Sequence, residues 1–319
     1  MRKTGISVAL SLLLLLFMTC LPAPSVEAAP SDLTITILAE PELEFTSVDP
    51  FWDRTGSEAA VVVVDDKQGL VDKYGKNLIP VEFYGVGSTF NWSEGVLYEV
   101  NNRIDDSHTQ SGLYTVSGSE AEELLPCVYD DINGYYRQGQ NMWVRLKKDG
   151  KYGLYDISRQ EILLECIYDE EIKVIPNGRF IVKENGKYGV INNNGQTVVD
   201  FAYDYLANIN LTQYLVKKDG QYKIIDQNQN TVRNYTYTKM EFFADNLAVA
   251  WDGAHYGVVD TSDRTVLSFV YDEIKPYSKA AEAAVARKDG KYGAVSSKGD
   301  TVVESVDFRY DNLINNYYY

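Results

Sequence analysis

Histidine and cysteine are scarce in this chain of 319 residues, which contains two histidines and three cysteines. His108 and His255 lie far apart in the sequence, and no group of Cys and His residues has the spacing of zinc ligands. No glycine-rich phosphate loop or dinucleotide-binding fingerprint is present either. From these absences we expect no metal, no cofactor and no catalytic residues, so the protein is predicted not to be an enzyme.

Positive charge is also in short supply. Lys and Arg number 30 against 46 Asp and Glu, which gives a formal net charge of −16. An acidic surface repels phosphate backbones and anionic lipid. We therefore expect no nucleic-acid partner and no membrane insertion of the mature chain.

A long apolar run occurs only at the N-terminus. Arg2 and Lys3 precede an apolar stretch over residues 6–21, and small or short residues at 26–28 suit a signal peptidase. The run is shorter than the ~20 apolar residues that span a bilayer. Residues 1–28 are therefore predicted to be a signal peptide, and the mature protein is predicted to be secreted, with association to the cell envelope left open.

Two questions about this end of the chain stay open. Lipidation at Cys20 is an alternative to cleavage after Ala28, although Phe17, Met18 and Thr19 are a poor version of the small residues that should precede a lipidated cysteine. Residues 29–57 are either a linker or a strand that latches onto the first repeat.

The rest of the chain is an internal repeat. An aromatic residue followed by glycine recurs at a spacing that settles near 35 residues, and a second landmark, Tyr-Asp, keeps step with it. The first landmark comprises Tyr152-Gly153, Tyr188-Gly189, Tyr256-Gly257 and Tyr292-Gly293. Degenerate copies, in which one residue of the pair differs, occur at Gln68-Gly69, Ser111-Gly112 and Tyr222-Lys223. The second comprises residues 129–130, 168–169, 203–204, 271–272 and 310–311, with degenerate copies at Tyr84-Gly85 and Tyr237-Thr238. Seven tandem repeats over residues 58–319 follow from the two landmarks together.

Each repeat is predicted to contain about three short strands. Runs of alternating or β-branched residues such as 142–148, 152–157 and 161–169 support strands, and no long helical period occurs after residue 28. The chain is therefore predicted to be all-β. Asx-Gly pairs before the glycine landmark predict type I′ hairpins, because both central residues need positive φ. These pairs are Asp149-Gly150, Asn185-Gly186, Asp219-Gly220, Asp252-Gly253 and Asp289-Gly290.

The landmarks themselves have a structural interpretation. The aromatic residue is expected to pack into the seam between neighbouring repeats, and the glycine is expected to allow a close backbone approach or a bulge. The Asp of Tyr-Asp is expected to cap the turn that begins the next repeat.

These phrases resemble the WG repeat family, bacterial β-rich repeats with a Lys-Trp-Gly core. The matching phrases are "KKDGKYGLYD" (147–156), "KENGKYGVIN" (183–192) and "RKDGKYGAVS" (287–296), in which Tyr takes the place of Trp. The resemblance extends over about residues 58–314 and implies the fold. It implies no catalytic residues.

The arrangement of the repeats is predicted to be a propeller-like ring, because seven repeats suit a ring and a ring protects strand edges. An open β-solenoid or superhelical stack is the alternative, since degenerate repeats at one end suit a capped stack. Cys127 and Cys166 occupy equivalent positions in successive repeats. A disulfide between them would suit a stack, but aromatic residues fill the same position elsewhere, so both are expected to be core residues.

Carboxylates recur after the second landmark, at 130–131, 169–171 and 272–273. They could bind calcium or form a general acid and base pair. Their repetition at one register favours a structural role in turns.

Aromatic residues outside the repeat pattern are the remaining candidates for function. We predict that exposed rings could stack on sugars or anchor a peptide, although capping the end of the repeat array is an alternative. The candidate ligand contacts are Trp52, Trp92, Tyr135, Tyr136 and Trp143. A functional surface is therefore expected around residues 85–143.

Together these observations predict a secreted, non-enzymatic repeat scaffold that mediates protein or cell-envelope binding. The alternative is a carbohydrate-binding or glycan-active protein that uses the aromatic-rich loops of the early repeats. A cell-surface glycan is accordingly the second candidate partner, and calcium-stabilised architecture is a third hypothesis.

Overall fold

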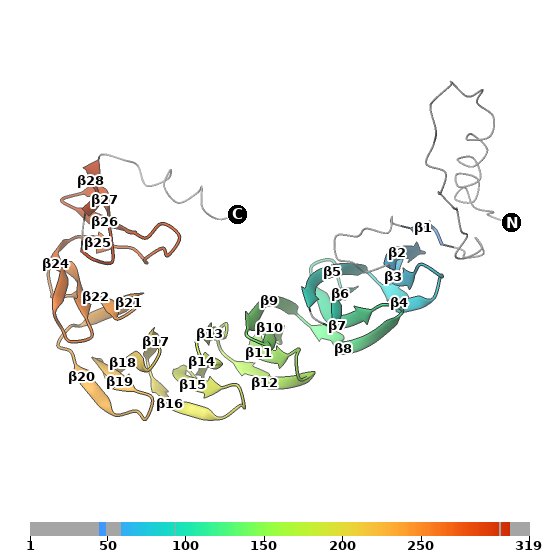
Figure 1. Cartoon of the computed structure of the whole chain (residues 1–319), viewed down its shortest axis with the longest axis horizontal. Helices are drawn as coiled ribbons and strands as arrows, with labels where there is room; N and C mark the ends of the chain where they lie inside the picture. Colours follow the sequence, from blue (N-terminus) through green and yellow to red (C-terminus); the bar gives the residue numbers. More distant parts are fainter. Residues whose placement is uncertain (1–44, 49–58, 93, 300, 307–319) are drawn as a thin grey trace, which may run out of the picture. The chain divides into compact units, whose positions relative to one another are not determined.

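The computed structural model describes residues 45–48, 59–92, 94–299 and 301–306, and the regular elements within them are strands (Figure 1). The predicted signal peptide, residues 1–28, and the candidate contact Trp52 lie outside the described residues. Within the described part of the chain, no helix has the length and apolar character needed to cross a membrane.

The strands form seven four-stranded antiparallel sheets, each made of four consecutive strands. The first three sheets comprise β1 (Ser47–Val48), β2 (Ala59–Val64), β3 (Lys67–Asp72), β4 (Asn77–Phe83); β5 (Gly85–Trp92), β6 (Gly95–Arg103), β7 (Thr109–Ser117), β8 (Glu120–Tyr129); β9 (Asp131–Gln138), β10 (Asn141–Lys148), β11 (Lys151–Asp156) and β12 (Glu161–Tyr168). The fourth and fifth comprise β13 (Lys173–Ile175), β14 (Arg179–Glu184), β15 (Lys187–Asn192), β16 (Thr197–Tyr203); β17 (Tyr205–Asn210), β18 (Gln213–Lys218), β19 (Gln221–Asp226) and β20 (Thr231–Asn234). The sixth and seventh comprise β21 (Lys239–Ala244), β22 (Leu247–Trp251), β23 (Tyr256–Asp260), β24 (Thr265–Tyr271); β25 (Glu273–Ile274), β26 (Ala284–Lys288), β27 (Lys291–Val295) and β28 (Thr301–Val306).

The all-β fold and the number of repeats are confirmed, and the structure adds a fourth strand to each repeat. The added strand follows the Tyr-Asp landmark and is the first strand of its sheet, as β17 is in the fifth sheet. It is only three residues long in β13 and two in β25, too short to show an alternating pattern. The sequence therefore predicted three strands of each repeat and missed the first, which is eight residues long in β5 and β9 and shorter in the other sheets.

Residues 45–48 belong to the segment that the sequence left as a linker or a latch. Ser47 and Val48 pair with Val63 and Val62 on the edge of the first sheet. Phe45 packs against the apolar cluster of that sheet, which contains Val62. This part of the segment thus supplies the first sheet with its fourth strand.

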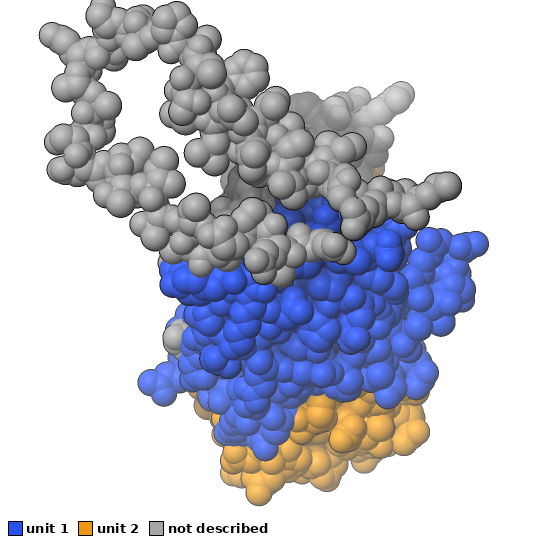
Figure 2. Space-filling view, turned by 90° about the vertical axis from the view of Figure 1, so that its right-hand side faces the viewer, with its two compact units in different colours: residues 1–150, 155–161 blue, residues 151–154, 162–319 orange. Residues whose placement is uncertain are grey.

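The chain divides into two compact units, coloured separately in Figure 2. Unit 1 contains residues 1–150 and 155–161, and unit 2 contains residues 151–154 and 162–319. The boundary passes through the third sheet, whose strands β9 to β12 draw on both units. Whether the seven sheets close into a ring or form an open stack stays a prediction.

The core lies between successive sheets of each unit. In unit 2, one apolar cluster joins the fourth and fifth sheets around Tyr214, a second joins the fifth and sixth around Met240, and a third joins the sixth and seventh around Val258. In unit 1, a cluster around Ile79 and Val100 joins the first two sheets. Each of these sheets therefore buries its apolar side chains against a neighbour, as expected when one repeat is too small to form a core alone.

Four of the five predicted type I′ hairpins are confirmed. Both central residues have positive φ at Asp149-Gly150, Asn185-Gly186, Asp219-Gly220 and Asp289-Gly290. The prediction is wrong for Asp252-Gly253, where only Gly253 has positive φ. There the Asp252 carboxylate accepts the amides of Ala254 and His255, which closes a longer loop between β22 and β23.

Candidate functional site

The landmark glycine faces a bulge in the fourth strand of its sheet. In the fourth sheet Tyr188 pairs with Tyr203 and Val190 with Val199, so three residues of β16 lie opposite Gly189. A Cβ on Gly189 would lie 2.9 Å from the carbonyl oxygen of Val199 and 3.0 Å from the ring of Phe201. The close backbone approach predicted from the sequence is therefore confirmed, and only glycine leaves room for the bulge.

The same geometry explains the position two residues before the second landmark. Its side chain covers the glycine in four sheets: Val81 over Gly69, Cys166 over Gly153, Phe201 over Gly189 and Phe269 over Gly257; at Gly112 the backbone of Cys127 makes the close approach. In the first repeat, Phe83 faces Gln68 as Tyr203 faces Tyr188. The landmark of that repeat is therefore Phe83-Tyr84, one residue earlier than the predicted Tyr84-Gly85.

Both described cysteines are free thiols that pack within their sheets. Cys127 is half-buried, and its Sγ lies 2.9 Å from the carbonyl oxygen of Gln110, to which it donates. Burial raises the pKa of the Cys127 thiol, which keeps it protonated and unreactive.

The fifth sheet shows what happens without the glycine. Lys223 replaces it, and the register there runs from Lys223 opposite Asn234 to Ile224 opposite Arg233 with no bulge between them. β20 is correspondingly short, and its four residues are exposed. The Cβ of Lys223 therefore excludes the bulge that the other sheets contain.

The Asp of the second landmark holds the hairpin tip of its own sheet. The amides of Gly150, Gly186 and Gly290 donate to Oδ2 of Asp130, Asp169 and Asp272 at 3.1, 2.7 and 3.1 Å. These are the recurrent carboxylates for which the sequence left calcium binding and acid–base chemistry open. Their hydrogen bonds support the structural interpretation.

The lysine that precedes the aromatic landmark links one sheet to the next. Lys151 Nζ lies 2.6 Å from Oδ1 of Asp169, and Lys187 pairs in the same way with Asp204. These ammonium groups hold the pKa of Asp169 and of Asp204 below the usual value of 3.8. "DGKYG" thus contains a hairpin tip, a lysine that contacts the next sheet, and a seam aromatic above a glycine.

The seam aromatic takes part in a second contact set in the fourth sheet. Glu170 accepts from Lys183 Nζ at 2.6 Å and from the Tyr188 hydroxyl at 2.6 Å. Lys183 also lies over the Tyr188 ring, 4.9 Å from its centroid. Lys183 holds the pKa of Glu170 below its usual value, and burial raises the pKa of Tyr188. Tyr188 packs against the cluster shared with the fifth sheet, which confirms the predicted seam position.

One candidate ligand contact is a core residue. Trp143 has 0% exposure, and its indole N–H donates to Oδ2 of the equally buried Asp156 at 3.1 Å. Trp143 therefore cannot be the exposed contact that the sequence predicted. Its position inside the repeat strand 142–148, which the sequence already assigned, was the signal that should have excluded it.

The other described candidates are half-buried and engaged with the protein. Trp92 donates its indole N–H to Thr115 at 3.3 Å, and Arg145 lies over Tyr136. Tyr135 stacks on Phe90 with ring centroids 5.7 Å apart, and burial raises its pKa to about 12. Each ring thus has its own internal contact, and their role as ligand contacts stays a prediction.

A serine, a histidine and an aspartate meet in the exposed turn between β6 and β7. Ser107 Oγ and Asp105 Oδ1 both lie 2.9 Å from the same ring nitrogen, Nδ1 of His108. A proton relay needs the serine on one ring nitrogen and the carboxylate on the other. The cluster is therefore a turn contact and not a nucleophile triad. No set of three or more His, Cys, Asp or Glu side chains among the residues described is arranged to hold a metal ion.

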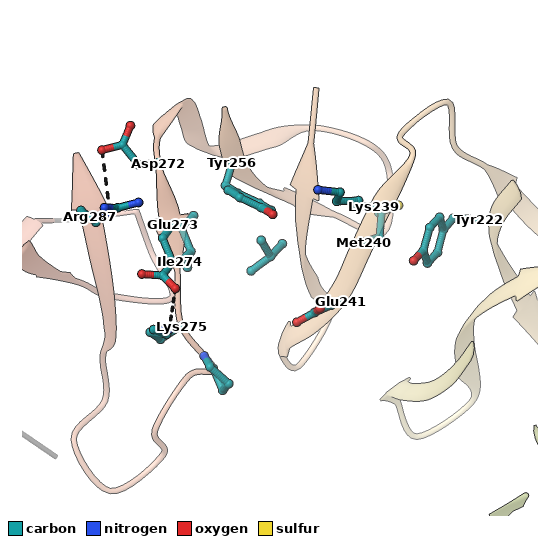
Figure 3. A pocket seen from close by; sticks show the side chains of 12 residues that line it. Tyr222, Lys239, Met240, Glu241, Tyr256, Asp272, Glu273, Ile274, Lys275 and Arg287 are labelled. Atoms are coloured by element: carbon teal, nitrogen blue, oxygen red, sulfur yellow. Dashed lines mark ion pairs between the residues drawn. The ribbon is translucent and has the colours of Figure 1, made fainter. Parts of the chain in front are cut away.

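A cavity of about 470 Å³ lies in unit 2, and residues of the fifth, sixth and seventh sheets line it (Figure 3). Its walls combine apolar groups with three basic and three acidic side chains. Arg287 Nε lies 4.0 Å from Asp272 Oδ2, and Lys275 Nζ lies 2.5 Å from Glu273 Oε1. In Figure 3, Arg287 and Lys239 approach Tyr256 from its two sides.

Lys239 and Arg287 occupy recurrent positions of the repeat. The residue after the second landmark faces the residue two positions before the hairpin tip, as Tyr205 faces Lys217 and Glu273 faces Arg287. In the sixth sheet the facing residues are Lys239 and Trp251. The position that is acidic in the seventh sheet is therefore basic in the sixth.

Comparison with protein families gives three matches to the WG containing repeat, at residues 152–188, 188–210 and 256–292. The chain carries WG repeats. A search of curated proteins finds no match to the sequence.

Several solved structures align with 66% or more of the chain. A eukaryotic initiation factor aligns with TM-score 0.38 and 11% identity over 78% of this chain and 85% of its own. Kluyveromyces lactis Hsv2 aligns with TM-score 0.34 and 9% identity over 75% of this chain and 89% of its own. The Neurospora crassa Pan2 WD40 domain aligns with TM-score 0.33 and 12% identity over 66% of this chain and 74% of its own. At these TM-scores and identities the likeness carries no argument about the arrangement of the sheets or about function.

The cavity lies at repeats whose landmarks are altered, and it was missed by sequence reasoning. The expected surface was around residues 85–143, whereas the cavity is lined by residues between 222 and 287. The available signal was that Lys239 stands where the seventh repeat has an acid, and Trp251 where it has a base. That the two residues face each other becomes visible only from the strand pairing in the structure.

Proposed function

We propose that this protein is a secreted, non-enzymatic WG repeat scaffold that binds a protein at the cell envelope, with the cavity of unit 2 as its binding surface. The observation that carries the proposal is the contrast between recurrent and variable positions of the repeat. The Asp and Lys residues that recur in several repeats are engaged in hairpin tips and in contacts between sheets, as Asp169 and Lys151 are. The residue after the second landmark changes from Glu170 to Tyr205, Lys239 and Glu273.

This contrast is typical of repeat proteins that bind through a constant frame and varied surface residues. The volume of the cavity is within the range of about 300–1,000 Å³ common for binding pockets. The acidic net charge of −16 favours partners without strong negative charge.

Site-specific photocrosslinking in the native host tests the proposal. In the test strain a benzophenone amino acid would replace Glu241, which lines the cavity. In two control strains it would replace Ile104 or Leu211, whose side chains lie outside the cavity and are 59% and 60% exposed. The proposal expects one discrete protein adduct from position 241 in the envelope or medium fraction, and none from the control positions. Equal adducts from all three positions, or none at 241, would contradict it.

The same strains test secretion. N-terminal sequencing of the protein from the medium or envelope should begin at Ala29, the residue after the predicted cleavage site. A cytoplasmic protein that retains residue 1 would contradict the proposed localisation.

The glycan alternative makes a different prediction. It requires saturable binding on a glycan array that is lost in Trp92→Ala, whose ring is half-buried at the end of β5. Release of reducing ends from a bound polysaccharide would establish glycan-active chemistry and contradict the non-enzymatic proposal.

A further inference from the structure

We propose that the cavity of unit 2 is a carboxylate-binding site for a ligand with one carboxylate on an apolar body, as the C-terminal residue of a protein presents it. This inference rests on the proposed function and specifies the chemistry of its partner. Four features of the cavity carry it: an ammonium without a carboxylate partner, a half-exposed guanidinium, two acids that are already engaged, and an apolar wall.

The unmatched ammonium belongs to Lys239. In the fourth sheet the corresponding position is Glu170, whose carboxylate is held by Lys183 and Tyr188. In the sixth sheet the ammonium of Lys239 has no carboxylate partner among the residues described and lies 5.3 Å from the centroid of the Trp251 ring. Its positive charge is therefore available to an anion in the cavity.

The second cation is Arg287. Its Nε is buried and has no hydrogen-bond acceptor within the described structure. The closest carboxylate, Asp272, lies 4.0 Å away and accepts the amide of Gly290. The Arg287 side chain is 40% exposed, so a ligand carboxylate can approach its guanidinium, which forms strong charge-assisted hydrogen bonds with carboxylates.

The acidic side chains of the cavity limit what the ligand can carry. Glu273 is paired with Lys275, and Asp272 has its hairpin role. Glu241 is exposed, is two residues from Lys239 on β21, and has no ion pair in the part of the chain described. Its repulsion grows with the negative charge of the ligand, so the site suits a single carboxylate better than a phosphate or an acidic cluster.

The rest of the wall is apolar. Tyr222, Met240, Tyr256 and Ile274 line the same cavity, and Tyr256 lies between the two cations in Figure 3. An apolar side chain next to the carboxylate would bury area on these groups, which contributes roughly 25 cal/mol per Å². The combination corresponds to the last residue of a polypeptide with a hydrophobic side chain.

The direct test is calorimetric titration of the mature chain with defined peptides at low salt. The probes are acetyl-Gly-Gly-Gly-Phe with a free carboxylate, the same peptide as its C-terminal amide, and acetyl-phenylalanine. We expect the free acid to bind at least tenfold more tightly than the amide. Equal affinity of acid and amide, or no binding of the acid at millimolar concentration, would overturn the proposal.

Acetyl-phenylalanine separates a peptide terminus from a small carboxylate. Binding at least tenfold weaker than that of the acid peptide supports the peptide terminus, because the peptide adds contacts beyond its last residue. Equal affinity would overturn the polypeptide source and assign a small carboxylate.

Charge-matched variants locate the site. Lys239→Gln and Arg287→Gln should each weaken binding of the acid peptide at least tenfold, while Glu241→Gln should tighten it by about twofold to threefold. Lys218→Gln removes the same charge from an exposed position outside the cavity and should leave Kd within twofold. Thermal unfolding of each variant confirms that it is folded, and an unchanged Kd in folded Lys239→Gln would contradict the assignment.

Failure of this inference is distinguishable from failure of the proposed function. A discrete protein adduct at position 241 without discrimination between acid and amide leaves the scaffold proposal standing and removes the carboxylate site. Selective binding of the acid peptide without any adduct in cells would leave the carboxylate site standing and remove the proposal that the cavity binds a protein at the cell envelope.

Discussion

The fourth and sixth sheets, which lie in the same unit, have the same frame and different seams. In both, a landmark glycine lies under a phenylalanine, Phe201 over Gly189 and Phe269 over Gly257, and faces a bulge in the last strand. In the fourth sheet the seam contains an acid, a base and a tyrosine hydroxyl in mutual contact. In the sixth the same positions hold Lys239, Trp251 and Tyr256: Lys239 lies over the Trp251 ring, and the Trp251 and Tyr256 rings are in tilted contact.

The loops differ in the same direction. The fourth sheet has a type I′ tip whose amide is held by Asp169, whereas the sixth has Thr238 in place of that Asp and a longer loop that ends at His255. His255 occupies the position from which Lys187 reaches Asp204 in the next sheet. The comparison teaches that a sheet with the bulge and the apolar clusters keeps its fold when the charged contacts of the seam are absent. The positions of those contacts are then available for the proposed binding site.

The largest expected effect tests the shared frame. Gly189→Ala and Gly257→Ala should each destabilise the protein by about 2–3 kcal/mol, because the new methyl group would overlap the carbonyl oxygen of Val199 or Leu267. Urea unfolding followed by circular dichroism measures the loss.

Gly87→Ala is the matched control, because nothing lies within 4 Å of its added Cβ. A loss at Gly189 or Gly257 no larger than that at Gly87 would show that the bulge does not require glycine.

The seam network provides the next largest effect. Tyr188→Phe removes the hydroxyl that donates to Glu170 and should cost about 1 kcal/mol. Tyr256→Phe should cost less than about 0.5 kcal/mol, because the Tyr256 hydroxyl has no hydrogen bond among the described residues. Equal unfolding midpoints of the two variants would contradict the difference between the two seams.

Restoring the missing lysine should stabilise the protein slightly. His255→Lys would offer Asp272 the ion pair that Lys187 makes with Asp204, and exposed pairs contribute about 0.2–1 kcal/mol. The gain should appear in the urea midpoint at pH 7 and disappear in 1 M salt. His255→Gln, which cannot form the pair, should show no gain, and a similar gain in that variant would refute the explanation.

The smallest effect is the contribution of the ion pair between Lys151 and Asp169 to the pH dependence of stability. Lys151 lowers the pKa of Asp169 below 3.8 in the folded protein. A lowered carboxyl pKa stabilises the fold above the unfolded value and loses that contribution as the pH falls through the folded value. Stability should therefore decline below about pH 4, the ordinary range of Asp.

Carbon-13 titration of the Asp169 carboxyl measures this directly. Lys151→Gln should raise the pKa of Asp169, because it removes the first contact that lowers it. An unchanged pKa in that variant would show that the ion pair does not form in solution.

Much of the fold could be predicted from the sequence because the repeat encodes it locally. Asn185-Gly186 specifies its turn through the positive φ of two residues, and Tyr188-Gly189 marks the seam aromatic and the close approach of β16. The candidate site could not be predicted in the same way. Trp143 looked available because aromatic residues surround it in sequence, but it is buried against Asp156.

The sequence by itself determined the repeat, its register, the all-β class and the turns, since each depends on residues within about 35 positions of one another. Only the tertiary structure decided that Lys239, in place of an acid, faces Trp251, in place of a base, because these residues meet through strand pairing. The structure also decided that Lys239, Arg287 and Tyr256 line one cavity, because they come from three strands of two sheets. Packing between sheets joins residues that no local pattern connects, and the proposed binding site lies there.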